Sequence, residues 1–277
     1  MNLQYRATYG QDLNALIRDE TSGWYQYLLG FLMLPPAYSD LRLLDLAMDG
    51  LGTNEAALIE FLVGRTPARV KAAKEAWEGR HDNSLVDRFN DELSGSFQHT
   101  VLTMLKTKRR AAEGRTPDDI DLDDPTGCAA ALHEAATGDD KEGAETLFVK
   151  TLALASGEQV DAIELAYEDE HDSSLRRCIS KNFDGWAQSA LLALLQPPDE
   201  WYASRLKESF DGMGTTDEAV CRILGCNDKK DVREIAAAYD KKYGKTLKAA
   251  IASECSGDYK RLLTAWIGLP DLLEQVT

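Results

Sequence analysis

The sequence has little that would anchor it within a bilayer or cross-link it covalently. No hydrophobic run approaches the roughly 18 residues that a membrane-spanning helix needs, and the opening segment MNLQYRATYG lacks the apolar core of a secretion signal. The five cysteines are odd in number and form no Cys-x-x-Cys pair. These absences argue against a transmembrane segment, a disulfide framework and a zinc ribbon, and they favour a reducing compartment.

Positive charge is scarce as well. Lysine and arginine number 31 against 47 aspartates and glutamates, which gives a formal net charge of −16. Nucleic-acid binding depends on basic side chains that neutralise phosphates, so this balance argues against it. It also argues against unaided binding to anionic lipid, because a surface potential of about −30 mV repels each nearby negative charge by roughly 0.7 kcal/mol. If the protein meets such a membrane, we expect a cation between the two.

What the chain does contain is an internal repeat. The segment FDGMGTTDEA from Phe210 matches MDGLGTNEAA from Met48, and SECSGDY from Ser253 matches DELSGSF from Asp91. The two matches share one offset although they lie far apart along the chain, so the register is kept without gaps. Glycines that precede a predicted helix also recur along the chain, and the spacing between them is shorter than the first offset and the same in each pair. The repeat unit that these offsets define is about 72 residues long.

These offsets predict the organisation of the chain. The first segment matches only the back half of a unit, and we interpret this as a truncation or a mispredicted start rather than a viable half-unit. An insertion, KRRAAEGRTPDDIDLDDP from Lys108, is typical of a solvated linker. The predicted segments are a half-unit at 1–36, complete units at 37–107, 125–196 and 199–268, a linker at 108–124 and a tail at 269–277.

Within a unit the periodicity is helical. Between Val232 and Tyr243 apolar residues fall at i, i+3, i+4, i+7 and i+11, on one face of a helix. Thr215-x-x-Glu218 predicts a capping box that opens another helix, with Thr53 at the matching place. We count about five short helices per unit and find no strand-like alternation. The predicted fold class is all-α.

Two repeated loops suggest a metal site. Gly50 and Gly212 each begin a Gly-x-Gly-Thr loop, and at the same distance further along the chain Glu92 and Glu254 each precede a Ser-Gly pair. Gly-x-Gly-Thr alone is equally typical of a simple helix-to-helix turn, so the distant carboxylate is the specific signal. Three loop carbonyls and one carboxylate suit calcium, which takes about six to eight oxygens. Affinity without lipid should be weak, on the order of 10⁻⁴ M or poorer, and lipid oxygens would complete the shell.

This spaced motif, Gly-x-Gly-Thr-x-Glu with Glu-x-Ser-Gly farther on, resembles the annexin repeat, and so does the run IASECSGDYKRLLTAWIGLP. The resemblance covers nearly the whole chain. It implies an array of five-helix repeats in a slightly curved disc, with calcium loops on the membrane-facing side. The ligands that it implies are the carbonyls of Met48, Gly50 and Gly52 with the side chain of Glu92, and the carbonyls of Phe210, Gly212 and Gly214 with the side chain of Glu254.

The other two units depart from this pattern. Glu20 matches the acidic ligand, but its glycine loop is absent from the chain. The segment from Gly138 to Gly143 resembles a variant annexin loop, yet Asn182 stands where the carboxylate belongs and Asp184 is the nearby substitute. A neutral amide replaces a bidentate anion poorly, so we assign no site to either unit.

The sequence thus predicts a calcium-dependent phospholipid-binding protein that is not an enzyme. It would dock peripherally, from the cytoplasm, on anionic membranes with phosphatidylserine-like headgroups. No catalytic arrangement is recognisable; His81 and His171 occupy one repeat position, where Tyr243 stands in another unit, and an aromatic helix edge explains them better. The alternative is a cytoskeletal or protein-interaction scaffold of the same fold with reduced calcium dependence, as in divergent protist annexins such as the alpha-giardins.

Two features stay open at this stage. The basic run from Lys106 to Arg110 is typical of a solvated helix end, and contact with lipid headgroups is the alternative. Trp186 directly follows the turn glycine Gly185, which suits either the core or a membrane interface.

Overall fold

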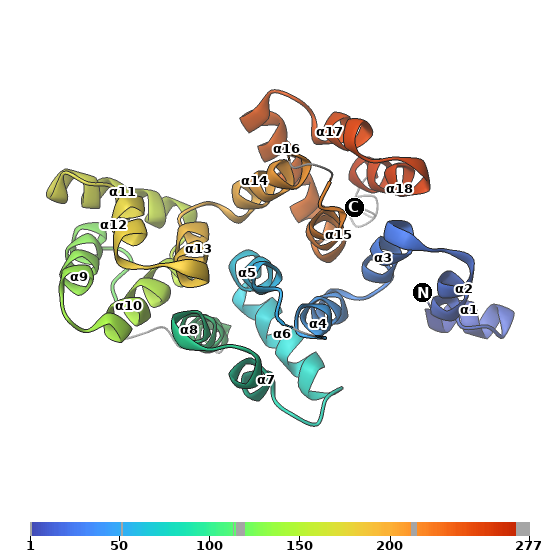
Figure 1. Ribbon diagram of the computed structural model, residues 1–277, viewed down its shortest axis with the longest axis horizontal. Coiled ribbons are helices and arrows are strands. Elements are labelled where there is room, and N and C mark those ends of the chain that lie inside the picture. Colours follow the sequence, from blue (N-terminus) through green and yellow to red (C-terminus); the bar gives the residue numbers. More distant parts are fainter. Residues whose placement is uncertain (1, 51, 113, 115–119, 212–214, 270–277) are drawn as a thin grey trace. The chain divides into compact units, whose positions relative to one another are not determined.

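The computed structural model describes residues 2–50, 52–112, 114, 120–211 and 215–269 (Figure 1). Over these ranges the secondary structure consists of eighteen helices, α1 to α18, without a strand. The predicted all-α fold class is therefore confirmed. The chain divides into two compact units, one made of Met1–Leu43 with Asp199–Thr277 and the other of Leu44–Pro198.

The unit Leu44–Pro198 contains two successive sets of helices, the first of which begins in the other unit. The first set is α4 (Pro36–Ala47), α5 (Glu55–Gly64), α6 (Pro67–Glu78), α7 (Leu85–Glu92) and α8 (Gly95–Ala112). The second set is α9 (Pro125–Thr137), α10 (Lys141–Leu154), α11 (Gly157–His171), α12 (Leu175–Asn182) and α13 (Gly185–Leu194). Five helices per set agree with the sequence-based count.

The other unit combines the two ends of the chain. Three helices come from the N-terminal end, α1 (Asn2–Tyr9), α2 (Leu13–Glu20) and α3 (Gly23–Leu32). The C-terminal end supplies a further set of five, α14 (Pro198–Asp211), α15 (Asp217–Cys226), α16 (Lys229–Tyr243), α17 (Leu247–Glu254) and α18 (Gly257–Gly268). Among the described helices none has both the length and the apolar composition needed to cross a bilayer.

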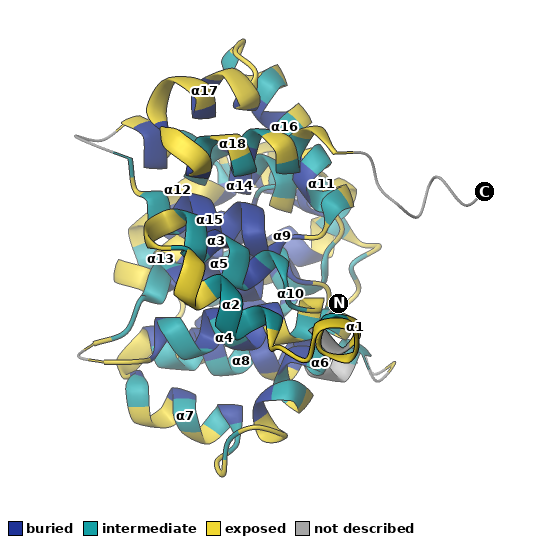
Figure 2. Cartoon of the chain, turned by 90° about the vertical axis from the view of Figure 1, so that its right-hand side faces the viewer, coloured by how far each residue is buried: buried dark blue, intermediate teal, exposed yellow. Residues whose placement is uncertain are grey.

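Short amphipathic helices recur at one place in every set. Each of α2, α7, α12 and α17 has the same length and begins with leucine. In α7 only Leu85 and Phe89, one helical turn apart, are fully buried, and α17 buries Leu247 and Ile251 with Ala250. Because residues i and i+4 lie on one helix face, this spacing ties α7 to the core by a narrow stripe. Figure 2 shows α7 and α17 mostly in the colours of intermediate and exposed residues.

The basic run and the predicted linker differ from expectation. Helix α8 continues to Ala112, so the stretch expected at 108–124 begins inside a helix. Lys108 is only 4% exposed, and its ammonium donates hydrogen bonds to the carbonyls of Val63 (3.4 Å) and Arg65 (2.5 Å), at the end of α5. Burial, with the nearby Arg65 as the smaller cause, lowers the pKa of Lys108 to about 7. The prediction of a solvated basic end is wrong at Lys108, because the side chain caps a neighbouring helix instead.

Candidate functional site

The loop after α4 is closed on itself. The amide of Asn54 donates to the carbonyl of Ala47 at 2.8 Å, which brings the two ends of the loop together. Gly50 and Gly52 have φ angles of +98° and +92°, which side chains rarely adopt, and a Cβ added at either would meet nothing within 4 Å. The glycines are therefore required by backbone conformation and not by crowding. This is the structural reason for the Gly-x-Gly pattern.

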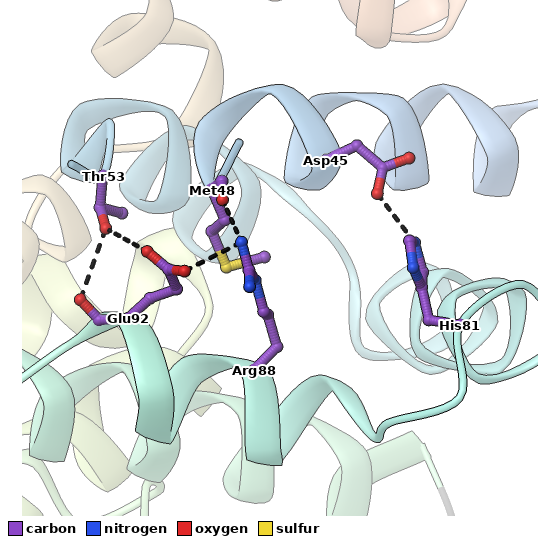
Figure 3. A network of polar contacts seen from close by, with 6 residues as sticks. All are labelled: Asp45, Met48, Thr53, His81, Arg88 and Glu92. Carbon is purple, nitrogen blue, oxygen red and sulfur yellow. Dashed lines mark hydrogen bonds and ion pairs between the residues drawn. The ribbon is translucent and has the colours of Figure 1, made fainter. Parts of the chain in front are cut away.

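Helix α7 delivers a carboxylate to this loop. The hydroxyl of Thr53 donates to the Glu92 carboxylate at 3.3 Å and lies 3.4 Å from the Glu92 backbone carbonyl (Figure 3). Glu92 is the last residue of α7, and the turn that follows it contains Gly95 at φ +61°. The structure thus brings together the loop and the carboxylate that the repeat spacing linked.

An arginine contacts both the loop after α4 and the Glu92 carboxylate. Arg88, one helical turn before Glu92 on α7, places Nη2 2.9 Å from Glu92 Oε1 and donates from the same nitrogen to the carbonyl of Met48 (Figure 3). A positive group therefore contacts two of the predicted ligands at once. A backbone carbonyl and a carboxylate oxygen are ligands of the kind that calcium prefers, so the chemistry of these two groups is compatible with calcium. Sequence analysis missed Arg88, although its position four residues before Glu92 on a helix is the spacing of an ion pair.

The second loop is closed in the same way. The amide of Thr216 donates to the carbonyl of Ser209 at 2.9 Å, and the Thr215 hydroxyl lies 3.4 Å from the backbone carbonyl of Glu254. The matching distances in the first loop are 2.8 Å and 3.4 Å, so the two closures are nearly the same. Of the predicted ligands, Phe210 lies in the last turn of α14, whereas Gly212 and Gly214 fall outside the described residues.

Glu254 lies in more acidic surroundings than Glu92. It lines a cavity of about 460 Å³ together with Glu20, Asp217 and Asp258. Its carboxylate accepts a hydrogen bond from the Ser253 hydroxyl at 3.2 Å. Burial raises the pKa of Asp217 above its usual value. Glu20, which has no glycine loop of its own in this chain, thus shares a cavity with the carboxylates of the second loop's repeat.

The predicted capping box is not formed. Asn54, and not Thr53, is the N-cap of α5, and its side chain accepts from the amide of Ala57 at 3.1 Å. Helix α15 likewise starts after Thr216, one residue beyond Thr215. The threonine hydroxyls contact the glutamates of the following turns instead. The threonines of the motif do form hydrogen bonds, but with residues distant in the sequence rather than within the helix that they precede.

The set α9 to α13 lacks this arrangement among its described residues. Gly143 lies in the first turn of α10, where its amide donates to the Asp140 side chain at 2.9 Å, so no open loop extends to it. Asn182 donates to the carbonyl of Cys178 at 2.9 Å, within its own helix. Asp184 precedes α13 and makes no capping hydrogen bond. These residues do not gather around one point.

Two exposed tryptophans lie in the two repeat units for which no calcium site is predicted. Trp24 and Trp186 each follow a turn glycine with left-handed φ, Gly23 (+60°) and Gly185 (+55°). Their side chains are 41% and 43% exposed, so neither is a core residue. Trp186 lies beside the turn of Glu92, with its ring 6.5 Å from that of Phe97. Contact of Trp186 with a membrane interface stays a prediction.

The histidines have aromatic and polar neighbours. His81 stacks on Trp77 with ring centroids 4.0 Å apart and contacts Asp45 at 2.8 Å (Figure 3). His171 ends α11 and stacks on His133 at 3.7 Å. These contacts match the helix-edge role expected from the repeat.

A family model, related sequences and solved structures all match this chain. The family model described as Annexin matches residues 39–104 and 202–266. Annexin A13 of Canis lupus familiaris is 34% identical over 266 residues, which are 95% of this chain and 82% of that protein. The solved structure of annexin III superposes with a TM-score of 0.85 at 29% identity and covers 98% of this chain and 83% of its own.

A structure described as calcium-bound annexin (Sm)1 shares the fold, with a TM-score of 0.78 at 24% identity, covering 97% of this chain and 81% of that one. The repeat spacing, the helical sets, the sequence relatives and the structural likeness agree. The chain belongs to the annexin family.

Proposed function

We propose that this protein binds anionic phospholipid membranes in a calcium-dependent manner. Such binding is typical of the annexin family, whose members are generally binding proteins and not enzymes. The observation that carries the proposal is the meeting of the Met48 carbonyl, from the loop after α4, and the Glu92 carboxylate, from the end of α7, at one cationic group. The second loop, with Glu254, supplies the other site.

Each residue has a separate task in this proposal. The positive-φ glycines shape the first loop, whose proposed ligands are the carbonyls of Met48, Gly50 and Gly52 with the anionic side chain of Glu92. The proposed ligands of the second loop are the carbonyls of Phe210, Gly212 and Gly214 with the side chain of Glu254. Bound calcium supplies a bridge between these oxygens and a lipid phosphate. Because the chain carries a net charge of −16, this bridge also offsets its repulsion from an anionic surface.

Co-sedimentation with phosphatidylserine-rich vesicles tests the proposal. We expect wild-type protein to pellet with calcium and to stay in the supernatant with a chelator. Replacing both Glu92→Gln and Glu254→Gln should abolish most of the calcium-driven pelleting, because each site loses its anionic ligand. Glu75→Gln together with Glu234→Gln, which removes the same two negative charges at exposed positions of α6 and α16, is the matched control and should bind normally. Equal pelleting in calcium and chelator would refute the proposal.

A scaffold with reduced calcium dependence is the second candidate. Its support is the set α9 to α13, where Asn182 and Gly143 are committed to hydrogen bonds of their own helices. This function predicts co-sedimentation with actin filaments or microtubules in the presence of a chelator. Filament binding that is absent without calcium would exclude it.

A further inference from the structure

The guanidinium of Arg88 lies where the calcium ligands of the first loop converge. Its Nη2 contacts the Met48 carbonyl and lies 2.9 Å from Glu92 Oε1, while Thr53 holds the other carboxylate oxygen at 3.3 Å (Figure 3). Two of the oxygens that calcium needs are thus already bound to a positive charge. A divalent cation and this guanidinium would repel each other strongly at such a distance, so both cannot hold these oxygens together.

The other sets carry no basic residue at this position. Aligning the four short helices α2, α7, α12 and α17 on their last residues places Leu16, Cys178 and Ala250 at the positions equivalent to Arg88. Each lies one helical turn before the end of its helix. Helix α17 therefore carries no counterpart of Arg88, and this basic residue is one of the charged groups in which the two repeats differ.

From this we propose that Arg88 is a built-in competitor for calcium, which raises the calcium concentration at which the loop after α4 fills. The inference rests on the proposed function, since it presumes that this loop binds calcium. Calcium must displace the guanidinium before it reaches Met48 and Glu92. The free energy of breaking this charge-assisted contact is subtracted from the binding free energy of that site.

The surroundings of Arg88 allow this displacement. Its side chain is about one-third exposed, so it is not locked into the core. It also lines a cavity of about 430 Å³ whose wall includes the carboxylates of Asp45 and Asp49 and the guanidinium of Arg80. His81, which contacts Asp45 at 2.8 Å, shares that wall. The cavity offers the displaced guanidinium both space and carboxylate partners.

A purely structural role for Arg88 predicts the opposite effect. If the arginine only holds the loop and α7 together, its removal loosens the site and weakens calcium binding. If it competes, its removal frees two ligands and tightens binding. The sign of the change in calcium affinity separates the two roles.

Calcium titration by isothermal calorimetry without lipid makes this test, with Glu254→Gln as the background that isolates the first loop. We expect Arg88→Met, which keeps the alkyl chain and removes the charge, to tighten calcium binding roughly 10- to 100-fold. Arg88→Lys should give a smaller gain, because the charge stays and the forked geometry is lost. Lys74→Met removes a comparable ion pair with Glu78 on α6 and is the matched control, expected to leave affinity unchanged.

The outcomes separate this inference from the proposed function. Unchanged or weaker binding in Arg88→Met overturns the inference, and the proposed function stands if the wild-type protein still binds calcium and pellets with vesicles. Absence of any binding to the first loop in both Glu254→Gln and Glu254→Gln/Arg88→Met also overturns it. If neither the wild-type protein nor any variant binds calcium or vesicles, the proposed function itself fails. Retained helical circular dichroism in each variant shows that the fold is intact.

Discussion

At the scale of single residues, the sequence indicates which side chains matter better than it indicates their environment. Lys108 belongs to a basic run that is typical of a solvated helix end, yet it is buried against the end of α5. Thr53 has the spacing of a helix cap, yet it binds the distant Glu92. Both errors have one cause, because a contact made by a distant helix leaves no trace in local spacing.

The buried ammonium of Lys108 makes stability depend on pH. Its folded pKa of about 7 lies below its ordinary value of 10.5, so below pH 7 both states are protonated and burial of the charge opposes folding in full. Between these values the unfolded chain binds a proton that the folded chain does not, and stability rises by up to about 1.4 kcal/mol per pH unit. Relative to Lys108→Met, we expect the wild-type protein to gain stability from pH 7 to pH 9.

Urea unfolding at the two pH values measures this gain. Lys230→Met, an exposed lysine on α16, is the control, and its stability relative to wild type should stay constant over the same range. A constant difference between wild type and Lys108→Met would show that the Lys108 ammonium is not desolvated.

At the scale of elements, close helix packing places limits on side-chain size. Helix α15 lies against α3 within one unit, and Gly225 is the residue at the contact. A Cβ added there would lie 2.9 Å from Phe31 Cβ and 3.1 Å from Leu28 Cδ1. Phe31 Cβ sits next to the backbone and cannot turn away as a side-chain tip could. The glycine therefore permits an approach that alanine would prevent.

We expect Gly225→Ala to lower the free energy of unfolding by about 1–3 kcal/mol through overpacking, less the roughly 1 kcal/mol by which alanine favours a helix. Gly268→Ala, at the end of α18 with nothing within 4 Å, is the control and should be neutral or slightly stabilising. Chemical denaturation of both variants gives the comparison. A Gly225→Ala variant that is more stable than the wild-type protein would mean that α3 and α15 lie farther apart than described.

At the scale of the whole molecule, the proposed sites link calcium to stability. A ligand that binds only the folded state stabilises it by about 2.7 kcal/mol per site when its concentration is roughly 100 times the dissociation constant. With dissociation constants on the order of 10⁻⁴ M, about 10 mM calcium reaches this condition.

We therefore expect calcium to raise the midpoint of thermal unfolding relative to chelator, and magnesium to raise it much less, because magnesium demands a tighter octahedral shell. Glu92→Gln with Glu254→Gln should remove most of the calcium effect. An equal shift by both ions, or a shift that survives the double substitution, would indicate general charge screening of this acidic chain. Differential scanning fluorimetry at fixed ionic strength is suited to the comparison.

The sequence by itself determined the helical class, the repeat period and the pairing of each glycine loop with a glutamate at one fixed distance along the chain, because these are matters of spacing. The boundaries of the predicted units remain predictions. Only the tertiary structure decided which cationic group holds the loop oxygens, where Lys108 lies and what Thr53 binds. Those features depend on side chains from separate helices meeting in space, and a contact of that kind is fixed by packing and not by neighbours in sequence.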